Sequence, residues 1–208
     1  MYIADNHGII MCLEVMRADL KPDGITKLLS FKALKIFLVS PTTRLKIWFR
    51  LGAYMRGKKQ WILIYFLIKL FFRHLQYKTG IQIRMDTQIG EGLHFIHFGN
   101  IVINASAKIG RNCTIFNGVT LGASFLGGLG PKVGDNVCLC TGAKVIGDVK
   151  IGNNVIIGAG AVVVKDIPDN AIVVGVPAKV ISMDGDRKAL MWSCLLYTSP
   201  SPRDRQKS

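Results

Sequence analysis

Two histidines three residues apart, His94 and His97, are the residues whose type and spacing most directly suggest chemistry. A neutral imidazole can take a proton from an alcohol near physiological pH, and it can also ligate a metal ion. The pair therefore predicts either a proton-transfer site or part of a metal centre. Each of the two is a candidate general base, and residue type and spacing do not choose between them.

A catalytic zinc site would need more ligands than this pair supplies. Zinc enzymes of the γ-carbonic-anhydrase kind use three protein ligands, typically all histidine, and a water. The remaining histidines, His7 and His74, lie outside the region around the pair. Cys138 and Cys140 have no second cysteine pair or nearby histidine. We expect no metal cofactor, and a zinc hydrolyase is kept only as a remote alternative.

A period of six residues indicates the elements that would position these side chains. From Ile103 to Val163 every sixth residue is aliphatic, with Gly127 as the one exception. The period continues upstream with a two-residue offset, at Ile83, Ile89, Phe95 and Ile101. Six residues fit neither a 3.6-residue helix nor a strand meander, but they fit a β-solenoid with three short faces per coil. About five stacked coils over residues 81–183 would bury one continuous core.

The region before the repeats is predicted to be helical. Helical patterns cover 25–39, then Pro41 to about Met55, where proline suits a first helical turn, and then Trp61–Tyr77. We therefore assign residues 1–80 to a helical segment and 184–208 to a tail. Within the tail, 194–208 resembles a translated sequencing adaptor and is excluded from functional reasoning.

Charge is distributed unevenly along the 208 residues, whose net charge is +14. Residues 1–80 carry fourteen Lys and Arg against four acids, whereas 81–183 carry eight against six. No acid lies between Asp23 and Asp86. Cationic helices with interspersed aromatic residues are typical of amphipathic segments on anionic membranes. The alternative is a set of helices that pack on their neighbours and turn their basic residues to water. No nucleic-acid motif accompanies the charge, so we expect no nucleic-acid partner.

Two features bear on the compartment. The longest apolar run, 61–72, is shorter than the roughly 20 residues of a membrane span. The five cysteines are odd in number and irregularly spaced, which fits buried thiols in a reducing compartment. We expect a cytoplasmic protein that contacts the inner face of an anionic membrane through residues 24–80.

Several segments of the repeat region carry a family resemblance. They are GLHFIHFGNIVI at 92–103, NGVTLG at 117–122, GAKVIG at 142–147, IGAGA at 157–161 and the stretch from KDIPDN to VGVPAKVI at 165–181. Together they resemble the hexapeptide-repeat acyltransferases, and within them the serine acetyltransferase-like family. The resemblance implies a left-handed parallel β-helix, a homotrimer with sites between subunits, and O-acetyl transfer from acetyl-CoA to L-serine with His97 as the base.

The resemblance also implies where acetyl-CoA would bind. Small residues would let the pantetheine arm lie along a groove between adjacent subunits, namely Thr141, Gly142, Ala159 and Gly160. Lys165 and Lys179 match positions that bind CoA in related acetyltransferases, where they would meet its phosphates. The Gly-rich stretch 122–132 is expected to form a loop extruded from the coil toward the neighbouring subunit's site.

Three positions depart from the family pattern and leave the acceptor open. Ile96 stands where the family has an aspartate before the catalytic histidine, and Gly130 stands where a second histidine precedes a proline. Asn104 or Ala105 replaces a glutamate. These changes resemble a group with members that acetylate sugars in surface polysaccharide, so the acceptor is either L-serine or a sugar hydroxyl on a glycan. A non-catalytic solenoid is a third alternative. The nearest acids that could orient His97 are Asp86 and Glu91.

Overall fold

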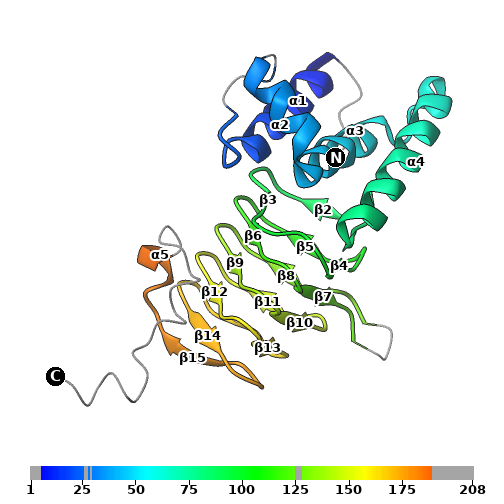
Figure 1. Cartoon of the computed structure of the whole chain (residues 1–208). Coiled ribbons are helices and arrows are strands. Elements are labelled where there is room, and N and C mark those ends of the chain that lie inside the picture. Colours follow the sequence, from blue (N-terminus) through cyan, green and yellow to red (C-terminus); the bar gives the residue numbers. More distant parts are fainter. Residues whose placement is uncertain (1–5, 26–27, 29, 125–127, 189–208) are drawn as a thin grey trace.

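The computed structural model describes residues 6–25, 28, 30–124 and 128–188, and it shows helices packed on one end of a β-solenoid (Figure 1). The helices are α1 (Asn6–Leu20), α2 (Phe31–Val39), α3 (Pro41–Met55), the 3₁₀ turn η1 (Lys59–Trp61) and α4 (Ile62–Thr79). The helix expected from residue 25 begins later, because the Ser30 hydroxyl caps it by accepting the Ala33 N–H at 3.1 Å. The expected start at Pro41 is confirmed. The tail from 189 onward, including 194–208, lies outside the described residues.

The solenoid is built from strands of two to four residues and ends in a short helix. In chain order its elements are β1 (Ile81–Gln82), β2 (Gln88–Ile89), β3 (His94–Phe95), β4 (Ile101–Ile103), β5 (Lys108–Ile109), β6 (Thr114–Ile115), β7 (Thr120–Gly122), β8 (Lys132–Val133), β9 (Cys138–Leu139), β10 (Lys144–Ile146), β11 (Lys150–Ile151), β12 (Ile156–Ile157), β13 (Val162–Val163), β14 (Ile172–Val174), β15 (Lys179–Ser182) and α5 (Gly185–Lys188).

The strands stack into three parallel sheets, which confirms the predicted parallel β-helix. Sheet A has the order β1-β4-β7-β10-β13, sheet B has β2-β5-β8-β11, and sheet C has β3-β6-β9-β12-β14 with β15 added antiparallel. In the described chain, four coils carry a strand on every face. The fifth has β13, a single bridge from Ile151 to Ile167, and β14.

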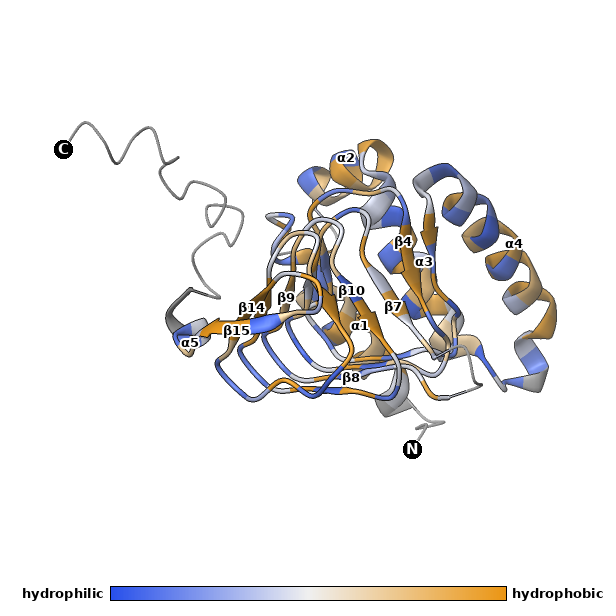
Figure 2. Ribbon diagram, turned by 90° about the horizontal axis from the view of Figure 1, so that it is seen from below, coloured by the Kyte–Doolittle hydropathy of each residue, from blue (hydrophilic) through white to orange (hydrophobic). Residues whose placement is uncertain are grey.

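The aliphatic period forms the interior of the solenoid. Described members of the period such as Ile115, Leu121, Leu139 and Val145 have no exposed surface. Cys113, Cys138 and Cys140 are buried as expected, and burial raises the pKa of the Cys113 thiol to about 12. The buried aliphatic residues of the period belong to one hydrophobic core that runs through the solenoid, and Figure 2 shows hydrophobic positions recurring along the stacked coils.

Two coils are longer than the rest, and each insertion falls at a corner. The coil from Lys144 to its partner Val162 has 18 residues, whereas that from Thr120 to Lys144 has 24. The extra length is the Gly-rich stretch 122–132, as expected, although 125–127 lie outside the described residues. The coil from Ile81 to Ile101 has 20 residues, and its two additional residues lie between β3 and β4.

A buried ionic cluster, the Asp19–Arg50 clamp, joins the helices to the first coil. The Arg50 guanidinium donates to both carboxylate oxygens of Asp19, at 2.8 and 3.2 Å. It also donates to the backbone carbonyls of Ile89 and Gly90, at 2.7 and 2.6 Å. Asp19 in turn accepts the backbone N–H of Leu93 at 2.8 Å. The clamp therefore fixes α1 and α3 against the strands that lead to the two histidines.

Candidate active site

One edge of the solenoid, where sheet C turns into sheet A, brings five of the candidate residues onto one ridge. The ridge consists of the stacked corners 96–100, 116–119, 140–143 and 158–161. Backbone hydrogen bonds tie one corner to the next: Gly118 N–H to Gly99, Gly142 N–H to Asn117 and Gly160 N–H to Thr141, each at 2.9 Å. Five of the predicted site residues lie on this corner ridge, namely His97, Thr141, Gly142, Ala159 and Gly160.

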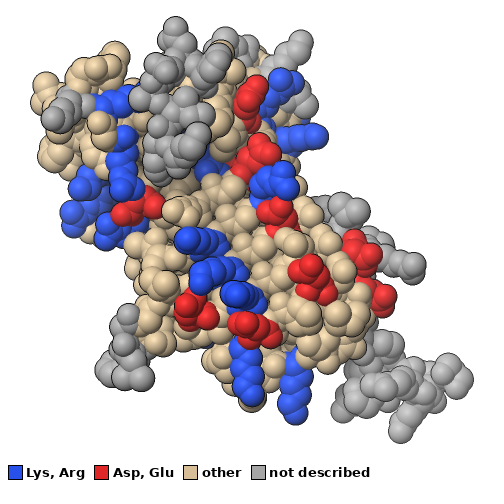
Figure 3. Space-filling view, turned by 180° about the vertical axis from the view of Figure 1, so that it is seen from behind, with Lys and Arg blue, Asp and Glu red and all other residues tan. Residues whose placement is uncertain are grey.

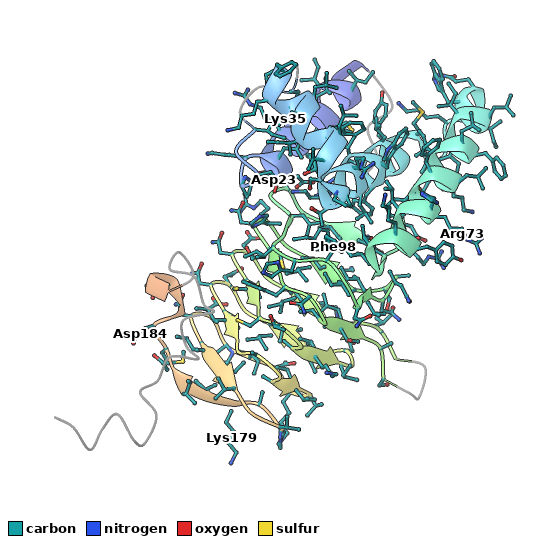
Figure 4. All side chains as sticks on the ribbon, viewed as in Figure 1. Asp23, Lys35, Arg73, Phe98, Lys179 and Asp184 are labelled. Atoms are coloured by element: carbon teal, nitrogen blue, oxygen red, sulfur yellow. The ribbon has the colours of Figure 1, made fainter. Side chains whose placement is uncertain are left out.

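His97 lies on the corner that contains the two additional residues. The chain there passes through Gly99 and Asn100 with φ of +113° and +52°, values that glycine and asparagine adopt most readily. The His97 side chain is exposed, and its ring meets the edge of the Phe116 ring one coil away, with centroids 6.3 Å apart. Phe98 follows it and exposes 51% of its surface (Figure 4). The imidazole is thus open to substrate on one side and supported by an aromatic ring on the other.

Neither of the acids nearest in sequence is brought to His97. Asp86 forms a bidentate pair with Arg84, at 2.9 and 2.7 Å, which holds the pKa of the Asp86 carboxyl below its usual range. Glu91 is exposed, and within the described residues it forms no hydrogen bond or ion pair with either histidine. Ile96 packs instead against an apolar cluster on the outer face of sheet C, which contains Phe116 and Cys140.

His94 lies in a different environment from His97, because it is partly buried beside the helices whereas His97 is exposed. The His94 side chain is 25% exposed, and its Nε2 lies 3.7 Å from the carboxylate of Asp23, a residue beside the helices that is labelled in Figure 4. Burial lowers the pKa of His94, the nearby Lys46 ammonium lowers it further, and Asp23 opposes both. The folded protein therefore holds a proton on His94 less readily than a free imidazole does, and His94 belongs to the helix–solenoid junction. In the described chain no group of three or more His, Cys, Asp or Glu is arranged to hold a metal ion.

The lowered pKa of His94 predicts a pH dependence of stability. The ordinary value is 6.5, so the unfolded chain binds a proton at this side chain at higher pH than the folded chain does. The stability that His94 contributes is complete above pH 6.5 and is lost as the pH falls through the interval down to the folded pKa. We expect urea titrations to show a free energy of unfolding that declines below pH 6.5, and His94→Gln to reduce that slope. His74→Gln, on the exposed side of α4, is the control, and equal slopes for wild type and His94→Gln would refute the assignment.

The residues expected at the CoA phosphates lie near the far end of the solenoid. Lys165 follows β13 on the corner between sheets A and B, and Lys179 begins β15; both are exposed (Figure 4). No described contact joins them to each other. Sequence reasoning missed Phe116 and Asn117, whose amide oxygen is 3.2 Å from the Thr141 hydroxyl. Both contacts depend on the strand register, since β3 pairs with β6 and β6 pairs with β9, and no local sequence signal identifies them.

Comparison with known proteins agrees with this architecture. A family model described as "Bacterial transferase hexapeptide (six repeats)" matches residues 130–165. A serine acetyltransferase from Staphylococcus xylosus is 39% identical over 143 residues, which cover 68% of this chain and 65% of that relative. A crystal structure of Neisseria gonorrhoeae serine acetyltransferase in complex with serine is 30% identical, with a TM-score of 0.69, and the match covers 85% of this chain and 72% of that one. A structure of serine acetyltransferase in complex with CoA is 26% identical, with a TM-score of 0.66. That match covers 85% of this chain and 71% of the other. The chain spans about half to two thirds of the length of the curated relatives that it matches.

Proposed function

The chain belongs to the serine acetyltransferase family, and on that premise we propose that it transfers the acetyl group of acetyl-CoA to the hydroxyl of L-serine. The observation that carries the proposal is the exposed His97 on a ridge shared with the small residues expected along pantetheine. Relatives solved in complex with serine and with CoA support both substrates.

In the proposed mechanism His97 is the general base. The imidazole accepts the proton of the serine hydroxyl while that oxygen attacks the thioester carbon of acetyl-CoA. Backbone N–H groups of the solenoid stabilise the tetrahedral oxyanion that forms. The carbon–sulfur bond then breaks, and the CoA thiolate takes the proton back from the imidazolium. No covalent acyl-enzyme is needed.

We propose that acetyl-CoA lies along the corner ridge. Thr141, Gly142, Ala159 and Gly160 present little side-chain bulk there, so an extended pantetheine can approach the backbone closely. Gly142 and Gly160 have φ of +72° and +66°, a conformation that a larger side chain would strain. Lys165 and Lys179 would meet the phosphates of CoA, and no metal takes part in the proposed reaction.

The proposed assembly is a homotrimer with sites between subunits. The match to the hexapeptide family supports a trimer, in which the ridge of one subunit would face its neighbour. The Gly-rich insertion at 122–132 would reach over the neighbouring site. We propose that each subunit of this trimer has two domains, a helical one at residues 1–80 and a solenoid at residues 81–183.

The second candidate acceptor is a sugar hydroxyl on a glycan. Ile96, which packs into an apolar cluster, supports it, because that side chain cannot orient an imidazole or bind an amino group as a carboxylate would. The deciding experiment follows thiol release from acetyl-CoA with L-serine and, separately, with nucleotide sugars and oligosaccharides. We expect release that saturates with serine; release with sugars alone would replace serine as the acceptor, and none with any acceptor would refute the function.

We also propose that the helices contact an anionic membrane surface. Within the described chain, no helix is both long and apolar enough to cross a bilayer. The contact that we propose is peripheral, through the cationic residues and exposed apolar side chains of 24–80.

A further inference from the structure

A groove between α4 and the first coils, the α4 groove, contains a cluster of cations that the proposed acetyl transfer does not use. Its volume is about 1130 Å³. Its walls carry Arg56, Lys69, Arg73 and Arg84 against a single acid, Asp86. Figure 3 shows lysines and arginines gathered on one side of the helical end of the molecule. A groove with this balance of charge suits an anionic ligand.

Among the described residues Lys69 and Arg73 have no anionic partner, and Arg56 interacts with Asp86 only at longer range. Arg84 and Asp86 neutralise each other at 2.7 Å. In the described part of the chain, no carboxylate lies within ion-pair distance of Arg56, Lys69 or Arg73. Arg73 donates to the Tyr77 hydroxyl, at 3.2 Å from its Nε and 3.1 Å from its Nη2, and its guanidinium carbon lies 5.7 Å from the centroid of the Tyr77 ring. Guanidinium groups match phosphate oxygens in both charge and geometry.

The outer face of α4 borders the groove and is apolar. Lys69 and Arg73 are four residues apart and therefore lie on one side of the helix, next to side chains that turn to solvent. The solvent-facing residues are Ile62, Leu63, Phe66, Leu67 and Leu70, of which Leu63 is 79% exposed. Figure 2 shows hydrophobic residues along much of α4 beside the solenoid. An exposed apolar face of this extent marks an interaction surface.

The aromatic residues of α4 fit the same surface. Tyr77 is exposed and lines the groove, as does Tyr65, and Trp61 immediately precedes the helix and is partly exposed. Tyrosine and tryptophan are enriched at the depth of lipid headgroups, because they have an apolar body and a polar tip. Cations, aromatic residues with polar tips and exposed apolar side chains thus occur together on α4 and its groove, and these are the groups that contact phosphate, interface and acyl chains in a lipid leaflet.

We propose that the α4 groove binds the phosphate of an anionic membrane phospholipid while the apolar face of α4 enters the acyl region. The inference rests on the membrane contact proposed above and assigns it a specific site. It is independent of acetyl transfer, because neither Lys69 nor Arg73 belongs to the corner ridge.

The test measures co-sedimentation of the full-length protein with vesicles of phosphatidylcholine, with or without phosphatidylglycerol. We expect binding only to the vesicles with phosphatidylglycerol, weakened by added salt. The double variant Lys69→Gln/Arg73→Gln should bind about thirty-fold more weakly, which corresponds to about 1 kcal/mol for each basic residue. Lys108→Gln/Lys150→Gln, at two exposed solenoid positions, removes the same charge and should bind as wild type does.

Three results would overturn the proposal. An equal loss in both double variants would mean that the attraction is diffuse, and binding regardless of lipid charge would mean that the groove takes no part. Absence of vesicle binding, with thermal stabilisation by glycerol 3-phosphate that Lys69→Gln/Arg73→Gln abolishes, would assign the groove to a soluble phosphate compound. Light scattering in the same samples tests whether a second copy of the chain covers α4 instead. Thiol release measured without vesicles should be the same in both double variants, so a failure here is distinguishable from a failure of the transferase proposal.

Discussion

Replacing His97 by alanine is expected to lower kcat for acetyl transfer by about 10²–10⁴-fold, the usual contribution of a general base. The serine hydroxyl is a poor nucleophile while it keeps its proton, and no described side chain on the corner ridge besides His97 can accept that proton at neutral pH. The His97 side chain is exposed, so circular dichroism and the free energy of unfolding should stay close to wild type. Thiol release from acetyl-CoA measures the effect.

His94→Gln provides the matched control for the loss of an imidazole. It should retain turnover, because His94 faces Asp23 and the helices rather than the ridge. Near-normal turnover in His97→Ala together with a large loss of turnover in His94→Gln would show that His94, and not His97, is the general base. Loss in neither variant would remove both histidines from the reaction.

Asp19→Ala is expected to lower the free energy of unfolding by about 3–5 kcal/mol, the cost of leaving one partner of a buried ion pair alone. Asp19 is 1% exposed, and the substitution would leave the Arg50 guanidinium and the Leu93 N–H without their carboxylate. Urea denaturation measures the change. Asp19→Asn keeps a hydrogen-bond acceptor, so its free energy of unfolding should fall by less. This variant can still be measured if Asp19→Ala does not fold.

Asp148→Ala is the surface comparison for that measurement. It breaks the Lys132–Asp148 pair at 2.9 Å, in which the side chains are 40% and 46% exposed. A pair of this kind is worth about 0–1 kcal/mol. Equal losses in Asp19→Ala and Asp148→Ala would mean that the Asp19–Arg50 clamp is not a stabilising element.

The solenoid could be predicted because each coil repeats a local rule. Ile103, Leu121 and Val145 lie inside for the same reason, and a six-residue period has few other structural solutions. The exposed corner of His97 did not follow from the period, because Ile101 fits the upstream phase and the offset therefore fell between Ile101 and Ile103, whereas the structure places the two additional residues between β3 and β4. The stacking of Phe116 beneath His97 follows only once the strand register is known.

The junction could not be predicted, because its partners are far apart in the chain. Asp19 meets Leu93 across 74 residues, and no local pattern signals that pairing. The count of basic residues in 1–80 treated Lys46 and Arg50 as surface charge, yet both are buried in the structure. The α4 groove was equally hidden, since its cations come from α4, the end of α3 and the first coil.

The carbonyl groups of Ile89 and Gly90 lie in the first coil, at the end of the solenoid that the helices cover. Along sheet B, the carbonyls of each later coil accept N–H groups from the coil before it. Gly90 N–H reaches Ile109, and Gly110 N–H reaches Val133, each in the next coil. No coil precedes the first one to supply such an N–H group, and the Arg50 guanidinium donates to the Ile89 carbonyl instead. A parallel stack with an unpaired end is a template on which another chain can add strands. By occupying these acceptors with a side chain and covering them with helices, the protein closes the end of a repeat that could otherwise grow into a fibre.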